Sequence, residues 1–144
     1  MKNLELNNQI EELRKLKNQI FKLRKLYDLI ENCEVKDYLK KIIIVSDKIY
    51  KEVAVNSNKI SKVQKLTDYY IVTARKIVSR YAKLKINGID SVESNELYMK
   101  IEKFMPRLNE YFEKIYESLF SAEILDVDAE IEVFIKELGM KKDL

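Results

Sequence analysis

The sequence contains no histidine and no tryptophan, and Cys33 is its only cysteine. Histidine is the commonest general base and the commonest metal ligand in proteins, so its absence argues against acid–base catalysis and against a zinc centre. A lone cysteine cannot form a disulfide within the chain. No Gly-x-Ser-x-Gly motif marks a nucleophilic serine. The composition therefore predicts a protein without a cofactor and without catalytic residues.

Glycine and proline are also scarce, with two glycines and one proline in 144 residues. Sheets and their tight turns usually need more of both, so the scarcity favours long helices joined by few connections. Apolar residues make up 47% of the chain and charged residues 35%. That mixture is typical of a globular protein rather than of a disordered or membrane-embedded one.

Long uncharged apolar runs are missing as well. The longest run, 42–45, is closely flanked by Lys41 and Asp47 and is far too short to cross a bilayer. The first residues lack the apolar core of a signal peptide. These features predict a cytoplasmic protein, with peripheral attachment to a membrane as the alternative.

Residues 4–31 carry a heptad pattern. Two rows of side chains, spaced seven residues apart and offset by three, fall on one helix face. The rows are Leu6, Leu13, Ile20 and Tyr27, and Gln9, Leu16, Leu23 and Ile30. Further apolar residues outside this seam suit a bundle better than a two-stranded coil. We expect residues 1–34 to form a heptad helix that either joins a bundle of residues 35–144 or pairs with another copy.

The rest of the chain repeats the same three-and-four spacing. It predicts helices over about 35–53, 59–85, 93–120 and 127–138. The row expected to be buried in the second helix is Val35, Tyr38, Ile42, Val45, Ile49 and Val53. The fourth helix offers the rows Leu97, Phe104 and Tyr111, and Ile101, Leu108 and Ile115. The fifth offers the stripe Val127, Ile131, Phe134 and Leu138.

Helix boundaries are marked by familiar residues. Gly88 and Gly139 are placed to end the third and fifth helices in the left-handed conformation. The pair Asp90-Ser91 is placed to cap the fourth helix, and Asp126 the fifth. Pro106, inside the fourth helix, removes one hydrogen bond and predicts a kink or a local break. The expected fold is an all-α antiparallel bundle of four to five helices, in which the fifth packs against a hairpin of the third and fourth.

Charge is distributed unevenly. Residues 36–87 hold 13 basic and 4 acidic side chains, net +9, whereas residues 88–144 hold 7 and 14, net −7. The simplest interpretation is mutual attraction when the third and fourth helices pack. Tyr69 and Tyr70 adjoin Lys65, Arg75 and Lys76, which favours a plain solvated face, with an acidic protein or lipid surface as the next alternative. Nucleic acid is the less favoured alternative because no nucleic-acid-binding motif is present.

Asp126, Asp128 and Glu130 resemble a metal cluster at first sight. Residues two apart on a helix point to different faces, and acidic residues in a first turn favour the helix dipole. We therefore expect no metal site there, with a cation site at these carboxylates as the weaker alternative.

Two stretches of the chain, 66–81 and 124–134, carry motifs that are similar to those of a known family. The first opens with the double tyrosine Tyr69-Tyr70 and closes on Tyr81, and Glu110-Tyr111-Phe112 matches a later aromatic step. These motifs resemble the C-terminal half, about residues 60–144, of the XpaC-like, 5-bromo-4-chloroindolyl phosphate hydrolysis family; residues 1–35 lie outside the resemblance. Val72 stands near where many members have a proline.

The resemblance implies a bacterial protein linked to toxic-anion (tellurite) resistance proteins. Its name also implies phosphate-ester hydrolysis, but Arg75, Lys76 and Arg80 alone could hold an anion without cleaving it. The favoured hypothesis is a non-catalytic interaction or scaffold protein; the alternatives are a phosphate-ester hydrolase and a nucleic-acid-binding protein using residues 36–87. The side chains expected to contact a protein partner or a second copy are Leu6, Leu13, Leu16, Ile20, Leu23, Tyr69, Arg75, Lys76 and Arg80.

Overall fold

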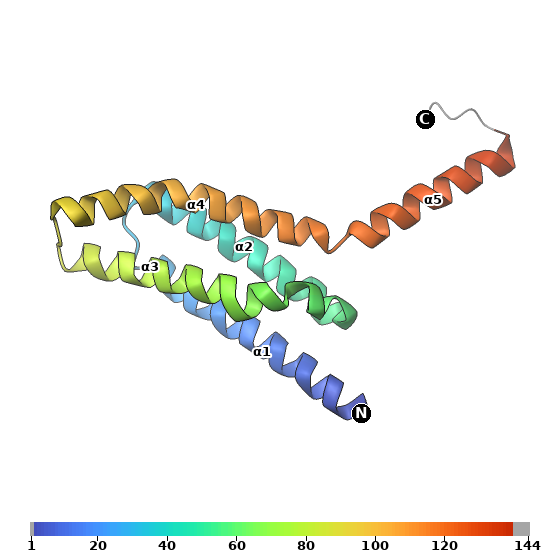
Figure 1. The fold of residues 1–144 in the computed structure, drawn as a ribbon, viewed down its shortest axis with the longest axis horizontal. Coiled ribbons are helices and arrows are strands. Elements are labelled where there is room, and N and C mark those ends of the chain that lie inside the picture. The colour runs from blue at the N-terminus through green and yellow to red at the C-terminus, as the bar shows by residue number, and fades with distance from the viewer. Residues whose placement is uncertain (1, 140–144) are drawn as a thin grey trace.

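The computed structural model describes residues 2–139, and this part of the chain is helical, without strands (Figure 1). The all-α prediction is therefore confirmed. The five α-helices are α1 (Lys2–Tyr27), α2 (Cys33–Val55), α3 (Ile71–Ile86), α4 (Val92–Ser118) and α5 (Ser121–Leu138). Helices α1 to α4 form a bundle in which α2 packs between α1 and α4, while α3 lies against α1 and runs antiparallel to α4. None of these helices is long and apolar enough to cross a lipid bilayer.

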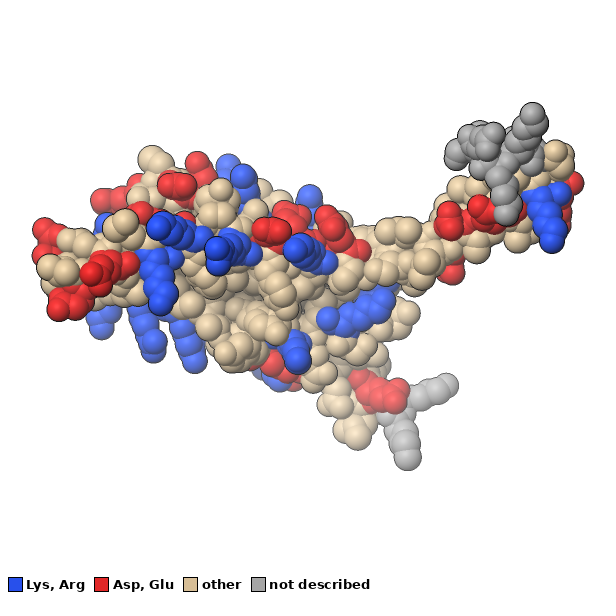
Figure 2. All heavy atoms as spheres, turned by 45° about the horizontal axis from the view of Figure 1, so that its top comes forward, with Lys and Arg blue, Asp and Glu red and all other residues tan. Residues whose placement is uncertain are grey.

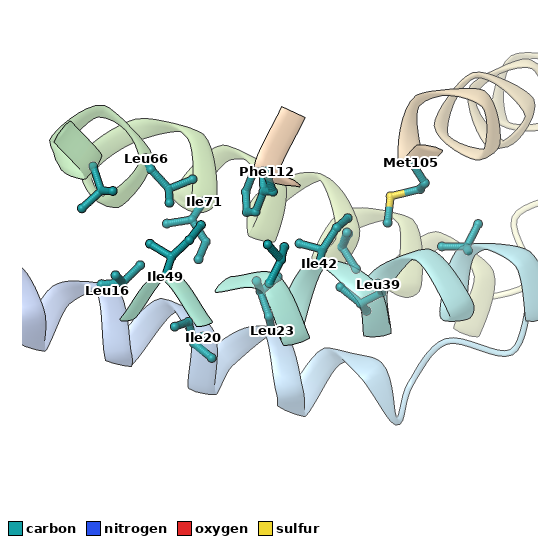
Figure 3. Close-up of a cluster of buried hydrophobic side chains, with 14 of the residues drawn as sticks. Leu16, Ile20, Leu23, Leu39, Ile42, Ile49, Leu66, Ile71, Met105 and Phe112 are labelled. Carbon is teal, nitrogen blue, oxygen red and sulfur yellow. The ribbon is translucent and has the colours of Figure 1, made fainter. Parts of the chain in front are cut away.

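The bundle core is one continuous cluster to which all four helices contribute. Figure 3 shows Leu16, Leu23, Ile42, Ile71 and Phe112 converging from α1, α2, α3 and α4. The predicted row of α2 is buried as expected, except that Tyr38 is only half-buried. Burial of apolar area at about 25 cal/mol per Å² makes this cluster the main source of stability.

Local capping sets where two of the helices begin. The Asn32 side chain accepts a hydrogen bond of 3.0 Å from the Val35 N–H at the start of α2. At the start of α4, Ser91 and Ser94 form a reciprocal capping box, with bonds of 3.0 and 2.8 Å. Of the predicted Asp90-Ser91 pair, Ser91 is therefore the cap, whereas the carboxylate of Asp90 accepts a bond from the Asn95 amide.

The predicted third helix is not uniform. Residues 57–63 form a 3₁₀ segment, η1 (Ser57–Val63), and a π-helical turn follows, η2 (Leu66–Tyr70), before α3 begins. The buried side chains explain both departures. Ile60, Val63 and Leu66 recur every three residues, which suits a 3₁₀ helix, and the next large buried side chain, Ile71, comes five residues later, as one π turn requires.

Helix α4 differs from the prediction in two respects. It continues through Pro106 as one helix, so the predicted alternative of a local break is wrong, whereas a kink stays a prediction. Met105 and Phe112 on either side are fully buried and hold the helix on the core. Its expected row of Leu97, Phe104 and Tyr111 is also 36–43% exposed. The buried row lies one position further on, at Tyr98, Met105 and Phe112, because that face of α4 packs against α2.

Helix α5 does not pack on the bundle, which corrects the expected arrangement. Figure 1 shows it projecting from the end of α4, and Ile135 alone among its residues is buried. The helix also begins earlier than predicted, so Asp126 lies inside it and caps nothing. Gly139 ends it with φ = 65°, and Gly88 ends α3 with φ = 66°, both as predicted.

Candidate functional site

The projecting helix α5 carries an apolar stripe that nothing in residues 2–139 covers. Its members recur with the heptad spacing of a helix-pairing surface and are 49–65% exposed. They are Ile124, Val127, Ile131, Phe134 and Leu138. Acidic residues flank the stripe, because Glu123, Glu130 and Glu137 each precede one member and Asp128 follows another. The side of α5 visible in Figure 2 accordingly shows mainly uncharged and acidic surface.

The junction between α4 and α5 is held by Lys59. This lysine is only 6% exposed, and its Nζ donates a 2.5 Å hydrogen bond to Glu123 Oε1. The same ammonium lies 4.8 Å from the centre of the Phe120 ring and 3.9 Å from Glu52 Oε2. A nearly buried ammonium needs such partners. The contacts therefore fix the direction in which α5 leaves the bundle.

The carboxylate of Glu123 responds to pH. The hydrogen bond from Lys59, then one from its own backbone, lowers the pKa of Glu123 below its usual value. A lowered folded-state pKa stabilises the junction at neutral pH, and that contribution is lost as the pH falls through the lowered pKa. We expect spin labels at Cys33, which is exposed, and at Val133→Cys to give a narrow distance distribution at pH 7. The distribution should broaden as the pH falls through the lowered pKa of Glu123.

Glu123→Gln should give the broad distribution at every pH. A label pair within the bundle, at Cys33 and Lys103→Cys, is the matched control and should stay narrow throughout. Equal broadening of the control pair would indicate that the bundle itself unfolds, and the pH effect would then not belong to the junction.

The predicted partner-binding residues of α1 fall into two groups. Leu16, Ile20 and Leu23 are buried in the core of this chain, so they are not available to a partner in this structure. Leu13 is half-buried against the same core. Leu6 is 54% exposed and lies on the part of α1 that extends beyond the bundle. Periodicity detected the apolar seam but could not show that the chain's own helices cover most of it.

The predicted basic and aromatic residues lie on η2 and α3. Tyr69 is exposed, and Tyr70 is half-buried with its ring centre 5.1 Å from that of Tyr111 on α4. Arg75 is held by α1, where its Nε donates a 2.8 Å bond to Gln19 Oε1. Lys76 and Arg80 are exposed and join no ion pair within residues 2–139. The structure therefore does not gather the predicted basic residues into one anion clamp.

The candidate metal ligands are not brought together either. Asp126, Asp128 and Glu130 lie along the exposed α5, and no three carboxylates or thiolates converge within the described part of the chain. A hollow of about 650 Å³ lies beside the α1–α2 connection, lined in part by Glu31, Tyr81 and Lys85. Burial raises the pKa of Tyr81, so this hydroxyl stays protonated. These groups supply neither a nucleophile–base pair nor a metal site.

The fold and this surface define an all-helical bundle protein with an exposed amphipathic arm. Comparison with known families places it more closely: the chain belongs to the 5-bromo-4-chloroindolyl phosphate hydrolysis protein family, whose model matches residues 1–134. The family resemblance is thus confirmed, but its predicted extent was too short, because the match also includes α1. No curated protein and no solved structure matched the chain.

Proposed function

We propose that this protein is a non-catalytic helical interaction protein and that α5 is its docking element. The observation that supports this is the heptad stripe of α5, whose five large apolar side chains are each about half exposed or more. Most of the stability of a protein helix comes from packing of its apolar face, so covering the stripe of α5 would stabilise it. A continuous stripe of this kind is typical of a helix that binds a partner surface.

The partner class follows from the flanks of the stripe. Helix α5 carries six acidic residues and one lysine, so its partner surface is apolar and bordered by basic side chains. The resemblance described above adds a bacterial toxic-anion-resistance protein as a candidate partner. Cytoplasmic residence remains part of this proposal.

Phosphate-ester hydrolysis is the second candidate, and the family description favours it. Hydrolysis of a phosphate ester needs metal ions or a positioned acid and base. The exposed basic residues of α3 supply charge but no such pair. We propose that the hydrolysis after which the family is named is an indirect effect for this chain.

The proposal predicts that partner recovery depends on one face of α5. The double substitution Ile131→Glu with Phe134→Glu places two charges on the stripe and should reduce recovery of proteins from a bacterial lysate at least tenfold. The substitutions Leu125→Glu with Val133→Glu put the same charge on the other faces of the same helix and should leave recovery unchanged. Quantitative mass spectrometry with isotope labels measures the amount of protein that each double variant captures.

Equal recovery by both double variants would count against α5 as the docking element. A separate assay addresses hydrolysis: the purified protein is incubated with a chromogenic phosphate ester and magnesium, manganese or zinc. Turnover that persists through purification and disappears on Arg80→Ala would contradict the non-catalytic proposal.

A further inference from the structure

A second uncovered apolar surface lies on the bundle, where α3 and α4 run side by side. On α4, Leu97, Phe104 and Tyr111 recur every seven residues and are 36–43% exposed. Beside them, Tyr70 at the end of η2 and Ile77 and Leu84 on α3 recur at the same interval and are half-buried at the edge of the core. We refer to these two rows together as the α3–α4 face.

One ring contact fixes how the two rows lie against each other. The Tyr70 and Tyr111 ring centres are 5.1 Å apart, in an edge-to-face arrangement. Because α3 and α4 are antiparallel, equal seven-residue steps in opposite directions place Ile77 near Phe104 and Leu84 near Leu97. The α3–α4 face is therefore a straight apolar strip, about 21 Å long at the rise of an α-helix.

The borders of the α3–α4 face are basic. On α4, each member of the apolar row is followed three residues later by a basic one, Lys100, Arg107 and Lys114. On α3, exposed Arg80 lies one turn from both Ile77 and Leu84. Figure 2 shows uncharged surface beside α4, with basic side chains and interleaved acidic ones along its border. Glu96 and Glu110 fall one position further round α4, away from α3, and Glu110 pairs with Lys114 at 3.3 Å.

Resting on the proposed role of α5, we propose that the α3–α4 face is the receptor for α5 of a second copy of this chain, so that two copies exchange their arms reciprocally. The apolar stripe of α5 matches the strip in length and spacing. Its flanking Glu130 and Glu137 meet the basic border of the face, which supplies charge complementarity. An exchange of this kind is a closed, two-fold arrangement in which each copy both gives and receives an arm.

Helix α5 could also dock on the α3–α4 face of its own chain, or pair with α5 of another copy. The structure favours the face of a second copy over both. The chain's own α5 is directed away from its α3–α4 face by the Lys59–Glu123 pair, and two residues alone connect α4 to α5. Two α5 helices paired with each other would bring their acidic flanks together. Two reciprocal arm contacts would bury on the order of 1,000 Å², the size at which specific interfaces begin.

The test is the solution mass of the full chain by sedimentation equilibrium. We expect twice the chain mass of 17.2 kDa for the unaltered protein and for the control Val133→Glu. The arm variant, Ile131→Glu with Phe134→Glu, and the face variant, Phe104→Glu, should each be monomeric. Circular dichroism of each variant should show unchanged helix content.

Mixing the two monomeric variants gives the decisive measurement. The mixture contains one intact arm, from the face variant, and one intact face, from the arm variant. A heterodimer should therefore form, with a dissociation constant at least tenfold weaker than that of the unaltered protein because one contact of two remains.

A dimer that survives Phe104→Glu, or the absence of a heterodimer in the mixture, would overturn the proposal. A monomeric unaltered protein that still captures a different protein through α5 would overturn the exchange while leaving the proposed docking function intact. If the substitutions in α5 affect neither partner capture nor dimerisation, the exchange of arms and the docking function of α5 are both rejected.

Discussion

Leu23→Asp is expected to prevent the chain from folding at 25 °C. Leu23 is completely buried where α1 meets the core, and an unpaired carboxylate there would lose its hydration without gaining a partner. The expected loss, above about 4 kcal/mol, is a large part of the stability of a domain this size. Circular dichroism at increasing urea should show a cooperative transition for the unaltered chain and none for the variant.

The matched control for that substitution is Leu6→Asp on the same helix. Leu6 is 54% exposed, so the control should change the free energy of unfolding by less than about 0.5 kcal/mol. Equal effects at the two positions would show that α1 does not pack as described and that residues 4–31 remain free for a partner.

Phe112→Ala is expected to have the second largest effect. The Phe112 side chain is fully buried where α4 packs in the bundle, as Figure 3 shows. Removing the ring leaves a cavity in a close-packed core, which typically lowers the free energy of unfolding by about 3–5 kcal/mol. Thermal and urea unfolding of the full chain should agree on a loss of this size.

Phe134→Ala on α5 provides the comparison with the same chemical change. Phe134 is 63% exposed, so its substitution should shift the urea midpoint of the bundle very little at concentrations where the chain is monomeric. A loss at Phe134 as large as that at Phe112 would show that α5 belongs to the bundle core, contrary to its projecting position.

The predictability of the individual helices follows from how many neighbours each one has. Helix α2 lies between α1 and α4, so its single apolar row had to be buried, and periodicity identified that row almost completely. Helix α4 has apolar residues over a wider arc, and both Leu97 and Tyr98 begin plausible rows. Only the packing against α2 decides between them, and single-chain periodicity holds no information about that contact.

The candidate site was less predictable for a related reason. The stripe of α5 was recognised in the sequence, but an apolar stripe looks the same whether its own chain or another molecule covers it. The sequence predicts a partner contact for Leu16, Ile20 and Leu23, which lie in the core, and a buried position for Phe134, which lies in solvent. For Phe134, the two-residue junction and the Lys59–Glu123 bond determine that outcome, and the bond joins residues that are distant in the sequence.

The shortness of the connection between α4 and α5 has a mechanical consequence. An 18-residue helix is about 27 Å long, so a change of about 20° in the backbone at Phe120 would sweep its far end through roughly 9 Å. The helix then acts as a lever whose pivot is a single hydrogen-bonded ammonium. Loosening that pivot would widen the volume that the tip searches for a binding surface, and tightening it would aim the tip in one direction.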